Sequence, residues 1–307
     1  MASSLALIIT CNPDKSFFSD LSIFLKEFSR ILIIDNHSND EIQKLLLGQQ
    51  SDNIEVILNQ ENLGVATALN QGFVWALKRG FDCVVTFDHD SFPQQGAIQN
   101  LRKVFVQANT NKLAIVASVI EDPKVQKQAR FLRARNKWMF ERVFCERKEL
   151  ENISFAITAG SLYSLNAYQQ IGAFQDNFFI DYVDEEYGLR ANQQGYKIVV
   201  ACDAKINHRL GEREKRNLLG RAHYPTFHSP LRWYYISRNR IPMLKKYAVR
   251  FPHWFFYEVI ASTYTFLRMI IFEGQRLKKL HAIFMGTRDG IFHRMGKASD
   301  EIQQKLS

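Results

Sequence analysis

Two aspartates stand one residue apart where an apolar segment ends, in the sequence FDHDS at residues 87–91. In an extended chain the side chains alternate between two sides, so Asp88 and Asp90 point the same way. Their negative charges repel each other, and a hard divalent cation with oxygen ligands would relieve that repulsion. Because Asp, Ser and Pro also favour turns, a strand-ending turn without a metal is the alternative.

A second acidic group is formed by Asp181, Asp184, Glu185 and Glu186. Capping signals predict a helix that begins near Asp184 and ends before Gly195. Acidic residues stabilise the start of a helix through its dipole and its free N–H groups, so part of this cluster has an ordinary structural explanation. Four carboxylates are more than capping requires, and the cluster is therefore a candidate for chemistry.

One histidine follows the second acidic group. A strand is predicted for YKIVVA, residues 196–201, and a short loop that leads to His208 is expected after it. Histidine binds metal ions, yet a lone histidine is more often an ordinary surface or core residue. His208 is therefore a candidate ligand only if the fold brings it to the aspartates.

These side chains need a scaffold, and the first 120 residues alternate between short apolar segments and amphipathic stretches. In one such stretch Phe17, Leu21, Phe24, Leu25 and Phe28 form a single apolar stripe, which predicts a helix. Short buried strands that alternate with helices predict a doubly wound, mostly parallel sheet, with ligands beyond the carboxyl ends of its strands. Strands are predicted at residues 5–10, 31–35, 54–58, 83–87 and 113–120.

Residues 121–152 interrupt this alternation with a basic and aromatic segment that we expect to be helical in part. The four cysteines, Cys11, Cys83, Cys145 and Cys202, are far apart, and three of them lie in or beside apolar segments. This spacing predicts reduced, buried thiols of a cytosolic protein rather than a disulfide or zinc framework. The opening MASSLALIITCNPD lacks a basic region and has too short an apolar run for a secretory signal, so it is predicted to be the first strand.

The positive charge is concentrated in the last third of the chain. The formal net charge is +9, but residues 205–297 hold 19 Lys and Arg against 5 Asp and Glu, so the remainder is net negative. Such an excess suits phosphates, anionic lipid headgroups or nucleic acid. The high aromatic content and the lack of a finger, basic zipper or RNA-binding signature argue against nucleic acid. The lack of a glycine-rich phosphate loop argues against an ATPase or a dehydrogenase.

An apolar stretch lies inside this basic region, at residues 255–272. Glu258 and Arg268 interrupt it, and a spanning helix usually needs about 20 predominantly apolar residues. We therefore expect an amphipathic helix, flanked by the basic sequences RWYYISRNRIPMLKKY and GQRLKKLH. Three settings for it stay open: peripheral contact with an anionic membrane, an ordinary helical bundle, or a homodimer interface.

Taken together, the motifs resemble a family 2 glycosyltransferase of the GT-A fold, in the branch of bacterial rhamnosyltransferases. The resemblance runs over roughly residues 5–240, and the ending FMGTRDGIFHRMGK also resembles the tail of that branch. It implies a mixed, mostly parallel sheet flanked by helices, with a catalytic domain at residues 1–225 and a C-terminal helical extension at 226–307. The motifs, in the order of the family, are ITCNPD, IIDNHSND, NLGVATALNQG, FDHDS, TAGSLYSL, FFIDYVDEEYGLR, QGYKI, NHRLG and RWYYISRNR.

The resemblance also implies a metal site. DHD matches the DxD motif, in which Mn²⁺ or Mg²⁺ neutralises the donor diphosphate. Asp90 would bind the metal directly, Asp88 would contact it through water or contact the ribose, and His208 matches a metal-associated histidine. Asp35 would accept a hydrogen bond from a pyrimidine N3–H. Nucleotide-sugar binding is implied for Thr10, Asn12, Asp35, Asn36, Asn62, Gly64, Asp88 and Arg238.

By the same resemblance, Asp184 stands six residues before Arg190, where inverting members keep their catalytic base. A base takes the proton of the acceptor hydroxyl, and neighbouring acids raise the pKa of such a carboxylate toward neutrality. Glu185 and Glu186 are the other catalytic candidates, and Glu186 is also expected to orient the acceptor or to pair with Arg190. The choice between Asp184 and Glu185 stays open.

The function so implied is metal-dependent, inverting transfer of L-rhamnose from dTDP-L-rhamnose to a carbohydrate or lipid-linked saccharide in bacterial cell-surface polysaccharide synthesis. One alternative is the same reaction with a UDP-hexose or UDP-galactofuranose donor. Another is a non-catalytic carbohydrate- or nucleotide-binding module, and a third is a basic protein that binds nucleic acid. The expected location is the cytoplasm, at the inner face of the plasma membrane.

Overall fold

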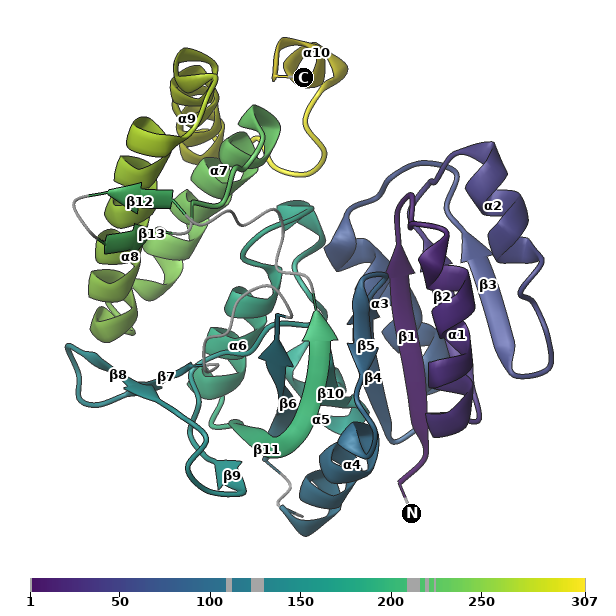
Figure 1. Cartoon of the computed structure of the whole chain (residues 1–307). Coiled ribbons are helices and arrows are strands. Elements are labelled where there is room, and N and C mark those ends of the chain that lie inside the picture. Colours follow the sequence, from purple (N-terminus) through teal and green to yellow (C-terminus); the bar gives the residue numbers. More distant parts are fainter. Residues whose placement is uncertain are drawn as a thin grey trace. The chain divides into compact units, whose positions relative to one another are not determined.

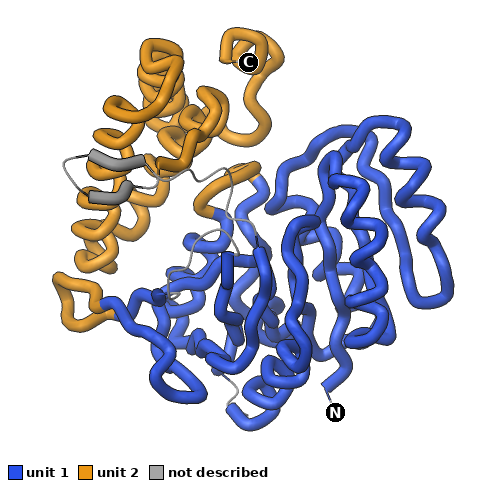
Figure 2. The backbone as a smooth tube through the Cα atoms, in the orientation of Figure 1, with its two compact units in different colours: residues 1–133, 142–176, 183–209 blue, residues 134–141, 177–182, 210–307 orange. Residues whose placement is uncertain are grey.

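The structure is a computed structural model, and it describes residues 2–108, 112–122, 130–208, 216–218, 221–223 and 225–306. The chain divides into two compact units (Figure 2), each described here by itself. Unit 1 comprises residues 1–133, 142–176 and 183–209, and unit 2 comprises residues 134–141, 177–182 and 210–307. The assignment of catalysis to residues 1–225, with a helical region at 226–307, stays a prediction.

Unit 1 is built on a mixed, mostly parallel sheet, as predicted (Figure 1). The strands that pair in it are β1 (Ser4–Thr10), β2 (Ile31–Asp35), β3 (Ile54–Leu58), β4 (Cys83–Asp88), β5 (Ser91–Pro93), β6 (Leu113–Glu121), β9 (Glu149–Leu150), β10 (Ser161–Ser164) and β11 (Lys197–His208). Their order is β3-β2-β1-β4-β10-β6-β11-β5, with β9 also paired to β11. Strands β3, β2, β1 and β4 are parallel neighbours, and β10 runs antiparallel between β4 and β6. The five strands predicted from the sequence are all present.

Helices cover both faces of this sheet because its strands are apolar on both sides. Ala6 and Ile8 of β1 share a buried cluster with Phe17, Leu21 and Phe24, which confirms the predicted amphipathic helix. Leu25 was predicted in the same stripe but is 42% exposed, because it lies at the edge of the buried face. The opposite face carries an aromatic cluster in which Tyr163 contacts rings from α3 and α6. The helices of unit 1 are α1 (Ser16–Glu27), α2 (Asp40–Leu47), α3 (Val65–Lys78), α4 (Ala97–Gln107), α5 (Leu165–Ile171) and α6 (Val183–Gln193).

Within residues 121–152, which were expected to be helical in part, the described residues form strands and no helix. Two short strands, β7 (Phe131–Ala134) and β8 (Phe140–Val143), pair with each other. Strand β9 then returns to the main sheet and pairs antiparallel with β11. The expectation was wrong for these residues because a local composition of basic and aromatic side chains does not report pairing with a distant strand. Residues 123–129 lie outside the described part.

The prediction of reduced thiols is wrong for two of the four cysteines, because Cys145 and Cys202 form a disulfide. The pairing of β9 with β11 brings them together: the Cys202 amide donates to the Lys148 carbonyl at 2.9 Å. The two cysteines are 57 residues apart in the sequence, so their spacing carried no signal of this contact. Cys11 and Cys83 are free thiols, and Cys83 is buried.

Strand β11 continues to His208, where a loop was expected after residue 201. Ala204 and Ile206 are buried while Lys205 and Asn207 are exposed, which is the period of two that a strand requires. This second half of β11 pairs with β5 on one side and with β6 on the other. His208 therefore has a fixed position at the end of the sheet.

Unit 2 contains the predicted C-terminal helices, namely α7 (Pro230–Tyr247), α8 (Pro252–Phe272), α9 (Arg276–Ile291) and α10 (Asp300–Leu306), with a hairpin of β12 (Arg216–Leu218) and β13 (Arg221–His223). Trp233 and Tyr235 of α7 share a core with Met269 of α8 and Met285 of α9. In the described part of the chain, α8 is the one helix with the length and apolar composition to cross a bilayer, and only 11% of its most apolar window is buried.

Two glycines let α9 approach the backbone of α7 closely. A Cβ atom added at Gly286 would overlap the Tyr234 carbonyl oxygen, and one added at Gly290 would overlap the Arg238 carbonyl oxygen. The neighbours are backbone atoms, which cannot move aside as the end of a side chain can. The spacing of four residues places both glycines on one face of α9.

We expect Gly286→Ala to lower the free energy of unfolding by about 3 kcal/mol, because overpacking against fixed backbone forces the two helices apart. Guanidinium unfolding followed by tryptophan fluorescence measures the change. Gly274→Ala is the matched control, since a Cβ there meets open space. Equal stability of the two variants would contradict the close packing of α7 and α9.

Candidate active site

The acidic pair lies at the carboxyl end of β4, next to a tight turn. Asp88 is the last residue of β4, and its amide donates to the Ser91 hydroxyl, which in turn donates to the Asp88 carbonyl, both at 2.8 Å. Ser91 is fully buried and begins β5. The turn predicted as the alternative is therefore real, and it holds Asp88 and Asp90 on the same side.

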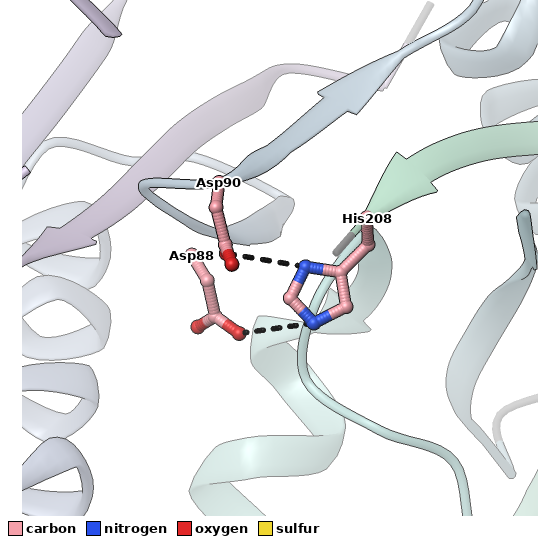
Figure 3. Close-up of side chains that lie close together, drawn as sticks. All are labelled: Asp88, Asp90 and His208. Carbon is pink, nitrogen blue, oxygen red and sulfur yellow. Dashed lines mark ion pairs between the residues drawn. The ribbon is translucent and has the colours of Figure 1, made fainter. Parts of the chain in front are cut away.

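Sheet pairing brings His208 to this turn. His208 lies directly opposite Ser91 in the antiparallel pairing of β11 with β5. Its Nδ1 is 3.2 Å from an oxygen of Asp90, and its Nε2 is 3.9 Å from an oxygen of Asp88 (Figure 3). The fold thus joins a motif at residues 88–90 with a histidine about 120 residues later, and the sequence condition on His208 is met.

The charges in this cluster shift the pKa values of His208 and Asp90 in opposite directions. Burial lowers the pKa of His208, but its contact with Asp90 and the charges of Asp88 and Asp90 outweigh burial and raise the pKa above its ordinary value. Burial raises the pKa of Asp90, and the contact with His208 and its charge outweigh that and lower the pKa. Both shifts have the same cause, which is that the positive charge of a protonated His208 and the negative charges of the two carboxylates stabilise each other.

The residues of the cluster fit a divalent cation. One ligand atom from each of Asp88, Asp90 and His208 lies within 4.8 Å of the others. Two carboxylates with one imidazole form a hard, mostly oxygen donor set of the kind that suits Mn²⁺ or Mg²⁺. The side chains of Asp88 and Asp90 remain 40% and 36% exposed, which leaves room for a substrate oxygen.

The three acids at the start of α6 have different surroundings. Glu186 is 1% exposed, and both of its oxygens receive hydrogen bonds from the Arg190 guanidinium, so the expected pairing with Arg190 is present. Arg190 also donates to the carbonyl oxygens of Ile171 and Ala173, which ties α6 to the end of α5. Asp184 and Glu185 are only half-buried, and an Asp184 oxygen accepts a hydrogen bond from the Glu185 amide at 2.9 Å.

The buried side chain of Tyr163 is influenced by an acid of α6 and by an acid of the Asp88–Asp90 pair. Burial raises the pKa of the Tyr163 hydroxyl well above its ordinary value, and the charges of Asp184 and Asp88 add to this rise. Tyr163 is fully buried and its hydroxyl has no hydrogen-bond partner among the described residues. The sequence analysis missed Tyr163, and its inward place in β10, within TAGSLYSL, was the available signal.

The residues implied for nucleotide binding gather at the carboxyl ends of β1, β2 and β3. Asp35 and Thr10 are fully buried, and the Thr10 hydroxyl donates to an Asp35 oxygen at 2.8 Å. The other Asp35 oxygen accepts a hydrogen bond from the Ser38 amide at 2.8 Å. Asp35 is therefore held by its own chain, and contact with a nucleobase stays a prediction. Ser38, which sequence reasoning missed, fixes this carboxylate.

The asparagines and the glycine of this group form the turns around it. The Asn12 side chain accepts hydrogen bonds from Asn39, and the Asn36 side chain accepts one from the Leu63 amide at 3.0 Å. The Asn62 side chain accepts one from the Gly64 amide at 2.9 Å, and Gly64 has a positive φ of 84° at the start of α3. These contacts shape a polar rim at the strand ends, while the nucleotide-binding role of Asn12, Asn36, Asn62 and Gly64 stays a prediction.

Two predicted residues lie in unit 2. Arg238 is 1% exposed, and its guanidinium donates hydrogen bonds to the carbonyl oxygens of Phe178 and Gly296, which both belong to unit 2. Asp181 is paired with Arg232 at 3.0 Å. These internal contacts favour a structural role, and the nucleotide-sugar role of Arg238 stays a prediction.

Comparison with known proteins agrees with the fold. Residues 21–172 match the family model "Glycosyl transferase family 2". The chain therefore contains a glycosyl transferase family 2 domain, and it has a GT-A type sheet with C-terminal helices. A curated relative, the dTDP-rhamnosyl transferase RfbF of Shigella flexneri, is 25% identical over 296 residues, which is 93% of this chain and 94% of the relative.

Two solved structures resemble the chain in fold. GalNAc-T7 with UDP, GalNAc and Mn²⁺ covers 78% of this chain with a TM-score of 0.55 at 14% identity, and the chain spans 47% of that structure. Residues 1–349 of TarS from S. aureus cover 96% of this chain with a TM-score of 0.55 at 10% identity, and the chain spans 82% of that structure. At these identities the likeness concerns the fold alone.

Proposed function

We propose that this protein is a metal-dependent, inverting glycosyltransferase that moves a sugar from a nucleotide donor to a saccharide acceptor. The observation that carries the proposal is the cluster of Asp88, Asp90 and His208 at the carboxyl ends of the strands, where open α/β sheets bind their ligands. Asp88, Asp90 and His208 would hold Mn²⁺ or Mg²⁺, which would neutralise the diphosphate as it becomes the leaving group.

In this proposal Asp184 is the general base. Its carboxylate takes the proton of an acceptor hydroxyl while that oxygen bonds to the anomeric carbon. The bond from the anomeric carbon to the diphosphate oxygen breaks, and the electron pair leaves with the diphosphate. Attack opposite to the leaving group inverts the anomeric configuration.

The surroundings of the three acids support Asp184 over Glu186 for this role. A base has to reach a substrate hydroxyl, and Glu186 is buried with both oxygens bound to Arg190. Glu186 and Arg190 would instead position α6. Asp184 is half-buried in the first turn of α6, and Tyr187 of the same helix contacts Tyr163 of β10, the strand that pairs with β4, so the start of α6 is tied to the part of the sheet that ends at Asp88.

We propose dTDP-L-rhamnose as the donor and a carbohydrate or lipid-linked saccharide of bacterial cell-surface polysaccharide as the acceptor. The support is the rhamnosyl transferase that matches over nearly the full length of both chains, at 25% identity. A cytoplasmic location at the inner face of the plasma membrane belongs to the proposal, and cell fractionation tests it. The Cys145–Cys202 disulfide is the observation against this location, since reducing compartments seldom keep disulfides.

A panel of nucleotide sugars tests the donor. We expect release of dTDP from dTDP-L-rhamnose in the presence of Mn²⁺ or Mg²⁺, by transfer to water, at least about tenfold faster than UDP release from UDP-hexoses or UDP-galactofuranose. Chelation should abolish the release. Nucleotide release measured by a coupled phosphate assay needs no knowledge of the acceptor.

Each rival predicts a different pattern in the same panel. Faster release from a UDP sugar would retain the reaction and replace the donor. Donor binding without metal-stimulated release, either to water or to a saccharide panel, would favour a binding module. Salt-sensitive DNA binding with no response to any nucleotide sugar would favour the nucleic-acid alternative.

A further inference from the structure

One face of α8 is apolar and exposed along its whole length. Phe256, Ile260, Leu267 and Ile271 recur at intervals of four or seven residues and are all exposed, with Ile260 at 69%. At 100° per residue they fall on one side of the helix, together with Thr263 and Tyr264. Arg268 borders this side, with its guanidinium carbon 4.7 Å from the centre of the Tyr264 ring. Surfaces of this length and composition mark interaction sites on soluble proteins.

The other face of α8 is fixed to unit 2. Trp254 and Met269 are fully buried. Glu258 is 7% exposed, and it pairs with Arg240 of α7 at 2.8 Å and accepts a hydrogen bond from the Tyr182 hydroxyl at 2.5 Å. A helix with a buried ion pair on one side cannot be surrounded by lipid, because breaking the pair or burying it in hydrocarbon costs several kcal/mol. The helix is therefore suited to lie along the surface of an apolar phase, with its exposed side in contact with that phase and its other side packed on unit 2.

The exposed charged residues in and next to α8, between residues 249 and 297, are all basic. Between residues 249 and 297 the carboxylates are Glu258, Glu273 and Asp289, and all three are at least nine-tenths buried. Each is paired within the unit, Glu273 with Lys279 and Asp289 with Arg288. The exposed charges of this segment are accordingly basic, namely Arg250, Arg276, Arg288, Arg294 and Lys297.

The next helix repeats the combination of apolar and basic residues. Leu277, the second residue of α9, is 83% exposed, and Phe284 and Ile291 are also exposed. These residues recur at seven-residue intervals on one face of α9. Arg288 stands between Phe284 and Ile291 on the same face. An apolar stripe with a cation inside it matches a partner that offers both hydrocarbon and negative charge.

We propose that the exposed faces of α8 and α9 form a docking surface for an anionic lipid bilayer. The apolar residues of α8 enter the boundary between headgroups and acyl chains with the helix parallel to the membrane, and the basic residues contact the anionic headgroups. A second copy of this chain fits less well, because two surfaces that each expose only cations repel each other. Nucleic acid fits the charge but makes no use of the apolar stripe.

Vesicle sedimentation with the full chain tests the proposal. We expect the protein to bind vesicles of phosphatidylcholine mixed with phosphatidylglycerol, to bind pure phosphatidylcholine vesicles at least about tenfold more weakly, and to lose affinity as salt is raised. The double variant Ile260→Glu/Leu267→Glu should bind the mixed vesicles at least about tenfold more weakly than wild type, since it charges the centre of the α8 face.

The matched control makes the same chemical change elsewhere. Leu47→Glu/Val106→Glu also replaces two exposed apolar residues, but on helices α2 and α4 of unit 1. It should bind vesicles like wild type, and circular dichroism checks that both variants are folded. Equal binding by the two double variants, or no preference of wild type for anionic vesicles, overturns the proposal. A wild-type dimer in analytical ultracentrifugation that only Ile260→Glu/Leu267→Glu dissociates also overturns it, in favour of a second copy. None of these readouts depends on the donor or on catalysis.

Discussion

Asp184→Asn is expected to lower the rate of sugar transfer by about 1,000-fold, because an amide cannot take the proton of the acceptor hydroxyl. General acid–base catalysis contributes typically between 100-fold and 10,000-fold. The helix start should survive, since the amide oxygen of Asn can accept the hydrogen bond that Asp184 accepts from the Glu185 amide. Transfer to a soluble or lipid-linked saccharide measures the effect, and donor and metal affinity should be unchanged.

Glu185→Gln is the matched control for this prediction. It removes a neighbouring half-buried carboxylate by the same chemical change, so it separates the two candidates that the sequence left open. We expect Glu185→Gln to retain most of the activity. If Glu185→Gln loses transfer while Asp184→Asn keeps it, Glu185 is the base, and if both keep it, the acids of α6 are not catalytic.

Asp90→Ala should abolish metal-dependent donor turnover, with a loss of about 1,000-fold. A metal that stabilises a leaving diphosphate contributes several kcal/mol, and each 1.36 kcal/mol is a factor of ten in rate. Asp90 is the closer of the two carboxylates to His208, at 3.2 Å. Its removal therefore takes away one proposed metal ligand and also the nearest carboxylate of a second proposed ligand, His208. Calorimetric titration with Mn²⁺ should show the loss of binding directly.

The fold should tolerate this substitution, because the Asp90 side chain is 36% exposed and its removal relieves repulsion with Asp88. Asp203→Ala is the control, since Asp203 is an exposed aspartate on the same strand as His208. It should bind Mn²⁺ and turn over the donor like wild type. Mn²⁺ binding and metal-stimulated release that persist in Asp90→Ala would contradict the proposed metal site.

The layered scaffold of unit 1 could be predicted from local pattern. Strands such as Ile31–Asp35 are short apolar segments, and Phe17, Leu21 and Phe24 have helical spacing. In each case the local pattern of apolar residues indicates whether the segment is a strand or a helix. The acidic pair and the acids of α6 could likewise be found, because their clustering in the sequence is unusual. Local pattern is sufficient here since the forces that select strand or helix act over a few residues.

Some assignments failed where a contact joins distant parts of the chain. The half of β11 after residue 201 was expected to be a loop, because its alternation of small, charged and apolar residues is weak without its partners β5 and β6. The Cys145–Cys202 disulfide was missed for the same reason, since the pairing of β9 with β11 creates it. Strand pairing depends on partners that a local window does not contain.

By itself the sequence determined the alternating scaffold, the two acidic groups and a basic, aromatic C-terminal third. Only the tertiary structure decided that His208 meets Asp88 and Asp90, that Glu186 is bound by Arg190, and that the apolar residues of α8 divide into a buried and an exposed face. The physical reason is that propensity and periodicity are properties of neighbouring residues. Convergence, pairing and exposure depend on how the whole chain packs, and that is settled by contacts between residues far apart in the sequence.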